Sequence, residues 1–513
     1  MKNRFLIIPF LFVLASFLQL GYISSHVVSP SQILRPLIVL WLVIALLIWP
    51  AYWLTRNWNW AVVLLTIIVL GFASSSEFFF VVLVFLAVVG VCWLAFIWLK
   101  RTKLQLTHFM YILMGTSLFF ASYALFLEGA MLARIPWMPY WQKMMDTRNY
   151  SLSSLSSLSV KRDIYYIVVD GYARSDILQE MFGFDNASFV SYLQEKGFVV
   201  PTSGHSNYPA TPLSIASTLN MDYIQSLVPA LNELPHRWLM APFIDYSRIR
   251  ALLESQGYQT VSLSTNWTIT DNVTTDQYLH PFPIMLTDFE GFVMDFTPLR
   301  SLEPILDGFA PPPTPETHRE VIRHNFATLS EIPDLPGPKF IFAHIISPHP
   351  PFVFDSAGTP LNSSHAFTFQ DANEFPGSRE EYREQYVGQV QFVNRQLQEA
   401  IDAILARSEL PPIIILQADH GSGMLTDLAS PENTCIEERF SPFGAYYLPD
   451  VRREAIPSDI STVNLFRIIL NEYFDAQLPL LENKQYFYKT MQSYYAFEDV
   501  TARLSEVCVL PKE

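Results

Sequence analysis

Long apolar runs separated by short polar loops fill the first quarter of the chain. A helix rises about 1.5 Å per residue, so roughly 20 apolar residues cross the hydrocarbon core of a membrane. Four runs reach about that length, and the third is shorter. The first run resembles the apolar part of a signal peptide, but no small-residue cleavage site follows it, so we expect it to be retained. We predict five transmembrane helices, at Phe5–Ile23, Pro36–Leu54, Trp58–Ala73, Phe78–Leu99 and Phe109–Leu127.

Basic residues in the short loops indicate the orientation of these helices. Lys2, Arg4, Arg56 and the basic run at 100–103 all lie on the side of the membrane that holds the N-terminus. Short loops rich in lysine and arginine stay in the cytosol. We therefore expect a multi-pass protein of a bacterial-type plasma membrane, with a cytosolic N-terminus and everything after the fifth helix outside.

From Asp163 onward, short apolar strands alternate with helical patterns. Strands separated by helices imply a mostly parallel central sheet covered by helices, which is an α/β fold. The predicted strands are Ile164–Val169, Tyr258–Ser264, Phe340–Ile346, Ile413–Gln417 and Ala445–Leu448. The predicted helices are Ala187–Lys196, Arg248–Gln256, Arg379–Arg407 and Ser461–Phe474. Residues 265–335 are rich in proline and show no clear pattern.

These patterns divide the chain into an N-terminal multi-span α-helical membrane domain, a connector and an outer α/β domain. The membrane domain covers residues 1–133, and the outer domain covers residues 163–513. The connector, 134–162, combines aromatic residues suited to a membrane interface with a Ser/Leu repeat, which is typical either of a surface-lying segment or of a flexible tether.

Charge and cysteine content narrow the choice of partners. The chain of 513 residues has a net charge of −15, and its outer part carries no basic stripe. Because phosphate contacts need clustered lysine and arginine, nucleic acid is excluded as a partner. Cys92 lies in an apolar run, whereas Cys435 and Cys508 lie in the outer part, where a disulfide between them is open to formation.

Side chains that could bind a metal or take part in catalysis lie at or near the ends of three predicted strands. Asp170 precedes a glycine directly after the first strand, and the sequence Asp419-His420-Gly421 follows a later one. His344 and His349 accompany a third strand. The carboxyl ends of strands in an open α/β sheet carry binding sites, and carboxylate and imidazole groups are ligands suited to a divalent metal. Each pair taken alone is equally consistent with an ordinary loop start.

Thr211 adds a hydroxyl group at the predicted start of a helix, directly before a proline. One interpretation is a helix cap. The other is a nucleophile at a helix N-terminus, where backbone amides and the helix dipole stabilise an anionic transition state.

Together these motifs resemble the alkaline phosphatase–sulfatase superfamily, and in particular its membrane branch of lipoteichoic acid synthases and phosphoethanolamine transferases. That branch joins five membrane spans to an extracytoplasmic catalytic domain, so the resemblance covers nearly the whole chain. It implies that one divalent metal, zinc or manganese, is held by Asp170, Thr211, Asp419 and His420. It also implies that Thr211 forms a phospho-enzyme intermediate, and that His349 and His344 contact the phosphoryl group or protonate the leaving group.

Several positions depart from that branch. Asp170 stands where the branch has glutamate, and no histidine follows shortly after Asp-His-Gly, which makes a second metal doubtful. Arg439 is a candidate replacement for that histidine, because a guanidinium group holds phosphate through two hydrogen bonds. His205 and Asn207 are further candidates for substrate binding. Ile215 stands where a formylglycine sulfatase would have arginine, which argues against classical sulfate-ester hydrolysis.

Three functions remain open from the sequence. The first is a membrane-anchored transferase that moves a phosphoethanolamine or phosphoglycerol group from a membrane lipid to an envelope glycan or lipid. The second is a sulfatase-like or phosphodiesterase hydrolase of exposed esters. The third is a non-catalytic protein that takes part in envelope assembly.

Overall fold

The computed structural model describes residues 4–72, 106–152, 160–295, 303–306, 308–362, 365, 367–506 and 508. The described chain forms two compact units. The first comprises Met1–Ile135 and Ile284–Pro312, and the second comprises Pro136–Pro283 and Pro313–Glu513. The sequence patterns did not indicate that residues 284–312 pack with the first unit.

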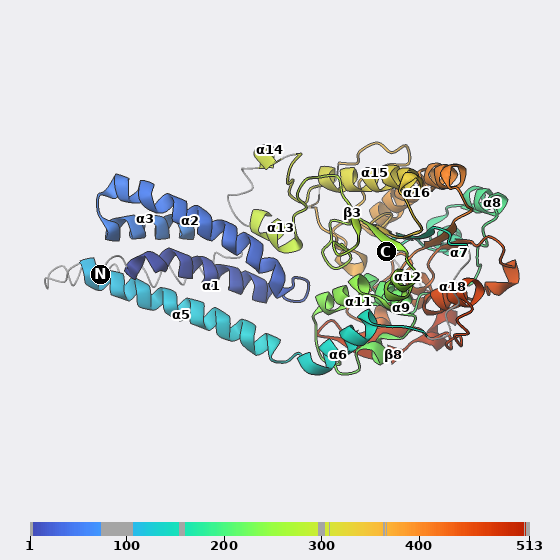
Figure 1. Cartoon of the computed structure of the whole chain (residues 1–513), viewed down its shortest axis with the longest axis horizontal. Helices are drawn as coiled ribbons and strands as arrows, with labels where there is room; N and C mark the ends of the chain where they lie inside the picture. The colour runs from blue at the N-terminus through green and yellow to red at the C-terminus, as the bar shows by residue number, and fades with distance from the viewer. Residues whose placement is uncertain are drawn as a thin grey trace. The chain divides into compact units, whose positions relative to one another are not determined.

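The first unit is built from apolar helices (Figure 1). Three described stretches, Arg4–Ile23, Pro30–Thr55 and Leu106–Leu132, are long and apolar enough to cross a membrane, and a shorter apolar helix covers Trp58–Leu70. The predicted span at Phe78–Leu99 lies outside the described residues. The helices of this unit are α1 (Ile8–Ile23), α2 (Leu34–Thr55), α3 (Trp58–Phe72), α5 (Leu106–Leu132), α13 (Asp288–Asp295) and α14 (Glu303–Leu306).

Helix α13 packs into the first unit through both apolar and polar contacts. Phe289 is fully buried, and its ring meets that of Phe17 edge to face with centroids 5.6 Å apart. The Phe289 amide donates to the side chain of Gln32, and Glu290 forms an ion pair with Arg35. Helix α13 is thereby joined to the start of α2, although more than 250 residues separate the two along the chain.

The second unit contains a six-stranded sheet in the order β3-β2-β4-β1-β5-β6. Every neighbouring pair is parallel except β5 and β6, as expected for the predicted α/β fold. The strands are β1 (Ile164–Val169), β2 (Gln259–Leu263), β3 (Gln277–Leu279), β4 (Lys339–Ile345), β5 (Ile413–Gln417) and β6 (Gly444–Tyr447). A separate hairpin joins β7 (Tyr486–Thr490) to β8 (Ser493–Asp499).

Alternate residues of a strand point to opposite faces of the sheet, and helices pack on both of these faces. On β1, Tyr165 and Ile167 enter a core shared with α15 and α16, while the ring of Tyr166 meets that of Phe466 on α18, 5.2 Å away. All six residues of β1 are buried, which explains its uninterrupted apolar sequence. The longer helices are α6 (Trp137–Arg148), α7 (Ser175–Phe182), α8 (Ala187–Glu195), α9 (Thr211–Asn220), α12 (Arg248–Ser255), α15 (Pro315–Glu331), α16 (Arg379–Arg407) and α18 (Leu465–Phe474). The shorter ones are α10 (Ile224–Leu227), α11 (Ala241–Asp245) and α17 (Ile436–Phe440).

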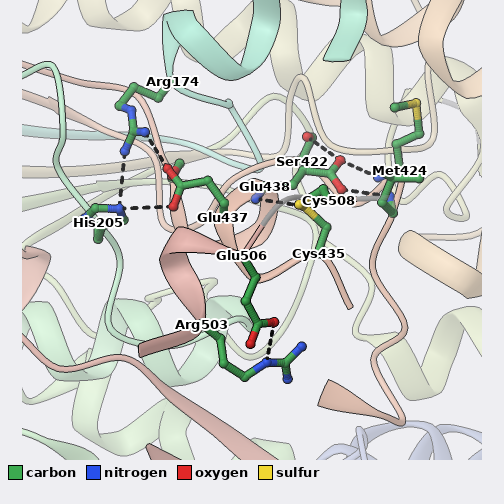
Figure 2. The surroundings of a disulfide bond; sticks show 12 residues. Arg174, His205, Ser422, Met424, Cys435, Glu437, Glu438, Arg503, Glu506 and Cys508 are labelled. Carbon is green, nitrogen blue, oxygen red and sulfur yellow. Dashed lines mark hydrogen bonds and ion pairs between the residues drawn. A yellow bond between two sulfur atoms is a disulfide. The ribbon is translucent and has the colours of Figure 1, made fainter. Parts of the chain in front are cut away.

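A disulfide joins Cys435 to Cys508 and ties the C-terminal segment to the start of α17 (Figure 2). The two cysteines are 73 residues apart. Closing a loop of that length contributes about 4 kcal/mol to stability on the chain-entropy account. The bond therefore fixes the short helix that carries Arg439.

Candidate active site

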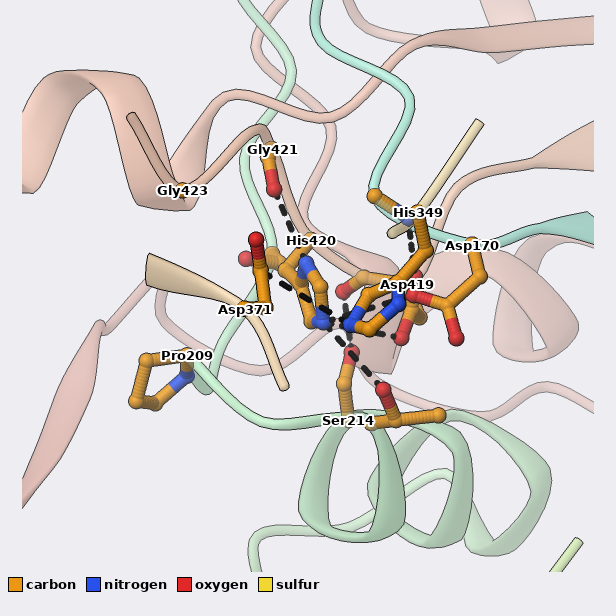
Figure 3. Close-up of polar contacts among 12 residues, drawn as sticks. Asp170, Pro209, Ser214, His349, Asp371, Asp419, His420, Gly421 and Gly423 are labelled. Carbon is orange, nitrogen blue, oxygen red and sulfur yellow. Dashed lines mark hydrogen bonds and ion pairs between the residues drawn. The ribbon is translucent and has the colours of Figure 1, made fainter. Parts of the chain in front are cut away.

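The candidate site lies where the carboxyl ends of three neighbouring strands meet. Because β1 lies between β4 and β5, the residues that end these strands converge at one edge of the sheet. The Asp170 amide donates to the carbonyl of Ile345 at 3.0 Å, and the Gly171 amide donates to Asp419 Oδ1 at 3.1 Å. Asp170 and Asp419 are both buried, and so is His420 (Figure 3).

Thr211 is the first residue of α9 and points toward these strand ends. Its Oγ1 lies 3.2 Å from His420 Nε2. The helix is held against the strand end by Ser214, whose hydroxyl donates to the carbonyl of Asp419 at 2.6 Å. The alternative interpretation of Thr211 as a helix cap is wrong, because the capping position is Ala210 and no side chain caps this helix. The hydroxyl group is thereby left to face the site.

The arrangement of donor atoms fits a divalent metal. Asp170 Oδ1 and Asp419 Oδ2 are buried and lack a hydrogen-bond partner within the described structure. Ligand atoms of Asp170, His344 and Asp419 all lie within 4.8 Å of one another. Buried carboxylate oxygens without partners are costly unless a cation compensates them. Carboxylate and imidazole donors together suit zinc or manganese.

The protonation states also suit metal binding. Burial raises the pKa of Asp170, but the nearby imidazoles of His349, His344 and His420 outweigh it and hold that pKa well below its usual range. Burial and the charge of Arg439 lower the pKa of His420. His420 Nδ1 lies 2.9 Å from the carbonyl of Gly421 and donates to it, which leaves the lone pair on Nε2. An ionised carboxylate and a neutral imidazole are the forms that ligate metals.

Gly421 and Glu438 explain the close packing behind the Asp-His-Gly motif. A Cβ atom at Gly421 would lie 1.9 Å from the carbonyl oxygen of Glu438, so only glycine fits there. The buried Glu438 carboxylate accepts hydrogen bonds from the hydroxyl of Ser422 and the amides of Met424 and Leu425, at 2.7–2.8 Å. These contacts hold the segment that follows His420 in place.

The two predicted histidines occupy different positions. His344 lies within β4 rather than after it, with Nε2 3.2 Å from Asp170 Oδ2 and Nδ1 2.9 Å from Thr270 Oγ1. His349 follows the strand, and its ring centroid is 6.3 Å from that of His420. Burial lowers the pKa of His349, but the carboxylates of Asp170 and Asp371 outweigh it and raise that pKa above its usual value.

Arg439 is also brought to the site, together with a residue that the sequence did not indicate. Its Nη2 lies 3.2 Å from His420 Nε2, and its Nη1 donates to Asp371 Oδ2 at 2.7 Å. Its Nε donates to the carbonyl of Pro209, two residues before Thr211. Asp371 is buried, accepts from the hydroxyl of Tyr382 at 2.9 Å, and lies 3.7 Å from His349 Nε2. No predicted strand or helix ends directly before Asp371, and Asp371 belongs to none of the motifs, so nothing in the sequence marked it.

His205 and Asn207 are committed to other partners. The side-chain oxygen of Asn207 accepts from Thr462 and Val463, and its amide donates to the carbonyl of Lys484. His205 Nε2 lies 3.6 Å from the carboxylate of Glu437 (Figure 2). His205 thus contacts helix α17 and Asn207 contacts the short helix Thr462–Asn464, and these contacts give no support to the substrate-binding role predicted for them.

Comparison with known proteins identifies the family of the chain. The family model described as "Sulfatase" matches residues 162–470, more than half of the chain. The chain belongs to the sulfatase family. This confirms the predicted superfamily, its α/β domain and its assignment as a sulfatase-like enzyme. A comparison with curated protein sequences finds no significant match.

Several solved structures are similar to this sulfatase-family chain, all at low sequence identity. The periplasmic domain of EcEptC from Escherichia coli is 12% identical, covers 69% of this chain and 95% of its own, and gives a TM-score of 0.44. The lipooligosaccharide phosphoethanolamine transferase EptA from Neisseria meningitidis is 13% identical, with coverages of 81% and 74% and a TM-score of 0.40. The putative sulfatase yidJ from Bacteroides fragilis is 14% identical, with coverages of 64% and 81% and a TM-score of 0.41.

Proposed function

We propose that this protein is a membrane-anchored, metal-dependent transferase that moves a phospho-alcohol group from a membrane lipid to an envelope glycan or lipid. The observation that supports this most directly is the position of Thr211. Its hydroxyl faces His420, beside two buried carboxylate oxygens that have no hydrogen-bond partner among the described residues. The apolar helices of the first unit would hold the site near lipid donors, with the catalytic unit outside the cytosol.

Each side chain has a role in the proposed reaction. Asp170, Asp419 and His420 would hold one zinc or manganese ion together with Thr211. When bound, that ion would lower the pKa of the Thr211 hydroxyl and offset phosphoryl charge. Thr211 Oγ releases its proton to water and forms a bond to phosphorus, while the bond from phosphorus to the diacylglycerol oxygen breaks.

Proton movement completes that step. The departing alcohol needs a proton, and His349 is suited to supply it from Nε2, because its Nδ1 is engaged with the carbonyl of Pro350. His344 is fixed between Thr270 and Asp170 and would position that carboxylate. The second step is the reverse of the first, with an acceptor hydroxyl in place of diacylglycerol.

Labelled lipids test this proposal against a hydrolase. We expect the full chain, incubated in vesicles with head-group-labelled phosphatidylethanolamine or phosphatidylglycerol and manganese or zinc, to release diacylglycerol and place label on Thr211. The label should then pass to an acceptor in an envelope extract. Label that appears only as free phospho-alcohol would favour the phosphodiesterase alternative. Rapid hydrolysis of an aryl sulfate, with no lipid cleavage, would favour the sulfatase that the family name suggests.

Arg439 is proposed to bind the phosphoryl group, and Asp371 to hold it in place. We expect Arg439→Lys to lower kcat/KM by about 100-fold, because lysine keeps the charge but not the three-way contact with His420, Asp371 and Pro209. Asp371→Asn should cause a smaller loss. The matched control is Arg319→Lys, which changes a buried, ion-paired arginine on α15 and should leave kcat/KM within about twofold of wild type. Equal activity of Arg439→Lys and wild type would remove Arg439 from the site.

A further inference from the structure

Helix α6 has one face that packs on the second unit, to which the helix belongs. Tyr140 is buried on this face. Its ring meets that of Phe243 on α11 edge to face with centroids 5.7 Å apart, and its hydroxyl donates to the carbonyl of Leu239 at 2.9 Å (Figure 1). Met144, one turn further along the same face, is also buried. Side-chain contacts therefore fix α6 to the second unit, which a flexible tether would lack.

The opposite face of α6 carries an apolar stripe, formed by Met138, Trp141 and Met145. These side chains are 81%, 51% and 43% exposed, respectively. Spacings of three and four residues place them on consecutive turns along one side of the helix. Asp146, which is also exposed, lies about 80° around the helix from Met138, at 3.6 residues per turn. Three large apolar side chains in a row on a helix of 12 residues are unfavourable in water, so the stripe calls for an apolar partner.

The chain enters α6 directly from a helix that is long and apolar enough to cross a membrane. Helix α5 has 27 residues, or about 40 Å at 1.5 Å per residue, which exceeds the hydrocarbon core and reaches the head-group region. At its end the chain turns, and the amides of Arg134 and Ile135 donate back to the carbonyls of Met131 and Leu132. Trp137 follows two residues later, so α6 begins within about 7 Å of that turn. The start of α6 therefore lies close to the membrane surface.

We propose that the apolar stripe of α6 lies in the lipid–water interface of the membrane that α5 crosses. The stripe enters the boundary between head groups and acyl chains by about 5–10 Å, as is typical of an interfacial helix, while Asp146 stays in water. Trp141 suits this depth, because its ring is apolar and its indole N–H can donate to head groups. Tyr140 instead serves the contact with the second unit, so α6 ties that unit to the membrane surface. This assignment goes beyond the proposed reaction and does not depend on it.

Nitroxide labels on single cysteines test the assignment, because oxygen concentrates in lipid whereas a nickel chelate stays in water. Each residue of the apolar stripe is replaced by cysteine in turn, in the full chain with Cys92→Ser. Cys435 and Cys508 are already paired in a disulfide. The controls are Asp146→Cys on the same helix and Arg395→Cys at an exposed position of α16. The labelled proteins are placed in vesicles of phosphatidylethanolamine and phosphatidylglycerol, and the collision rate of each label with oxygen and with nickel is measured.

We expect the ratio of oxygen to nickel collision rates at each position of the apolar stripe to exceed that of Arg395→Cys by about tenfold. Asp146→Cys should give a ratio well below those of the stripe. The proposal is overturned if the stripe gives the ratio of Arg395→Cys, because the stripe then faces water. It is equally overturned if both reagents are excluded from the stripe, because a protein partner or a second copy of the chain then covers it. Each position is read separately, so a variant that fails to fold leaves the others to decide.

Discussion

Thr211→Ala is expected to lower the rate of lipid cleavage by about four orders of magnitude or more, because the substitution removes the proposed nucleophile. The side chain is buried at the first turn of α9 and makes no capping hydrogen bond, so its loss should cost little stability. The measurement is diacylglycerol release from labelled lipid, with thermal unfolding followed in parallel. Thr211→Ser keeps a hydroxyl group at the same place and should retain measurable activity.

Ser217→Ala provides the matched control on the same helix. Its hydroxyl is buried and donates to the carbonyl of Asp222 at 2.8 Å, at the end of α9 away from His420. Loss of that hydrogen bond should cost about 1 kcal/mol of stability and leave the rate of lipid cleavage nearly unchanged. If Thr211→Ala supported full function in cells that lack the wild-type gene, the catalytic interpretation would be lost and the envelope-assembly alternative would take its place.

The sheet was predictable because its strands are buried on both faces. Ile164–Val169 and Ile413–Gln417 read as continuous apolar runs, and β1 and β5 have the predicted bounds. Helix α16, Arg379–Arg407, was equally clear because a long amphipathic pattern leaves little choice. No elements were predicted for residues 265–335, where α15 begins after a proline-rich segment and α13 packs with the first unit. Such packing depends on distant partners such as Gln32, which no local pattern reveals.

The site was predictable only where motif residues end strands or begin a helix. Asp170, Asp419 and His420 follow buried strands, and Thr211 precedes a proline, so each carried a local signal. Asp371 carried none, because it lies in an irregular segment and reaches the site through its contacts with Arg439 and Tyr382.

The substrate-binding role of His205 and Asn207 stays a prediction without support from their contacts. Closeness in sequence to Thr211 suggested a place in the site, but His205 contacts helix α17 and Asn207 contacts the short helix Thr462–Asn464. A residue near a nucleophile in sequence therefore needs a contact in the structure before it is assigned a role.

Removal of the metal is expected to abolish lipid cleavage and to destabilise the outer domain. Asp170 and Asp419 each have a buried oxygen that lacks a hydrogen-bond partner among the described residues. Because ligand atoms of the two side chains lie within 4.8 Å of each other, their negative charges repel one another unless a cation lies between them. A metal present at 1,000 times its dissociation constant would contribute about 4 kcal/mol. For a domain of this size that corresponds to a fall in melting temperature of roughly 5 °C on chelation. Activity should return on addition of zinc or manganese.

The variant Asp419→Asn tests the proposed metal site through the direction of its effect on the melting temperature. The amide oxygen can still accept from the Gly171 amide, so the local fold should be kept. With metal present, the variant should bind less metal and melt below the wild type, because a charged ligand is lost. After chelation the order should reverse or disappear, because the substitution removes one of two repelling charges.

The matched control for this carboxylate is Asp163→Asn. Asp163 immediately precedes β1, at the opposite end of the strand from Asp170, and its side chain pairs with Lys339 at 2.8 Å. The same chemical change there should leave metal content at about one ion per chain and leave activity intact, although it weakens the ion pair. Full activity of the wild type after chelation, with metal content near zero by elemental analysis, would contradict the metal site. Wild-type metal affinity in Asp419→Asn would instead exclude Asp419 as a ligand and leave Asp170, His344 and His420 as the group to test next.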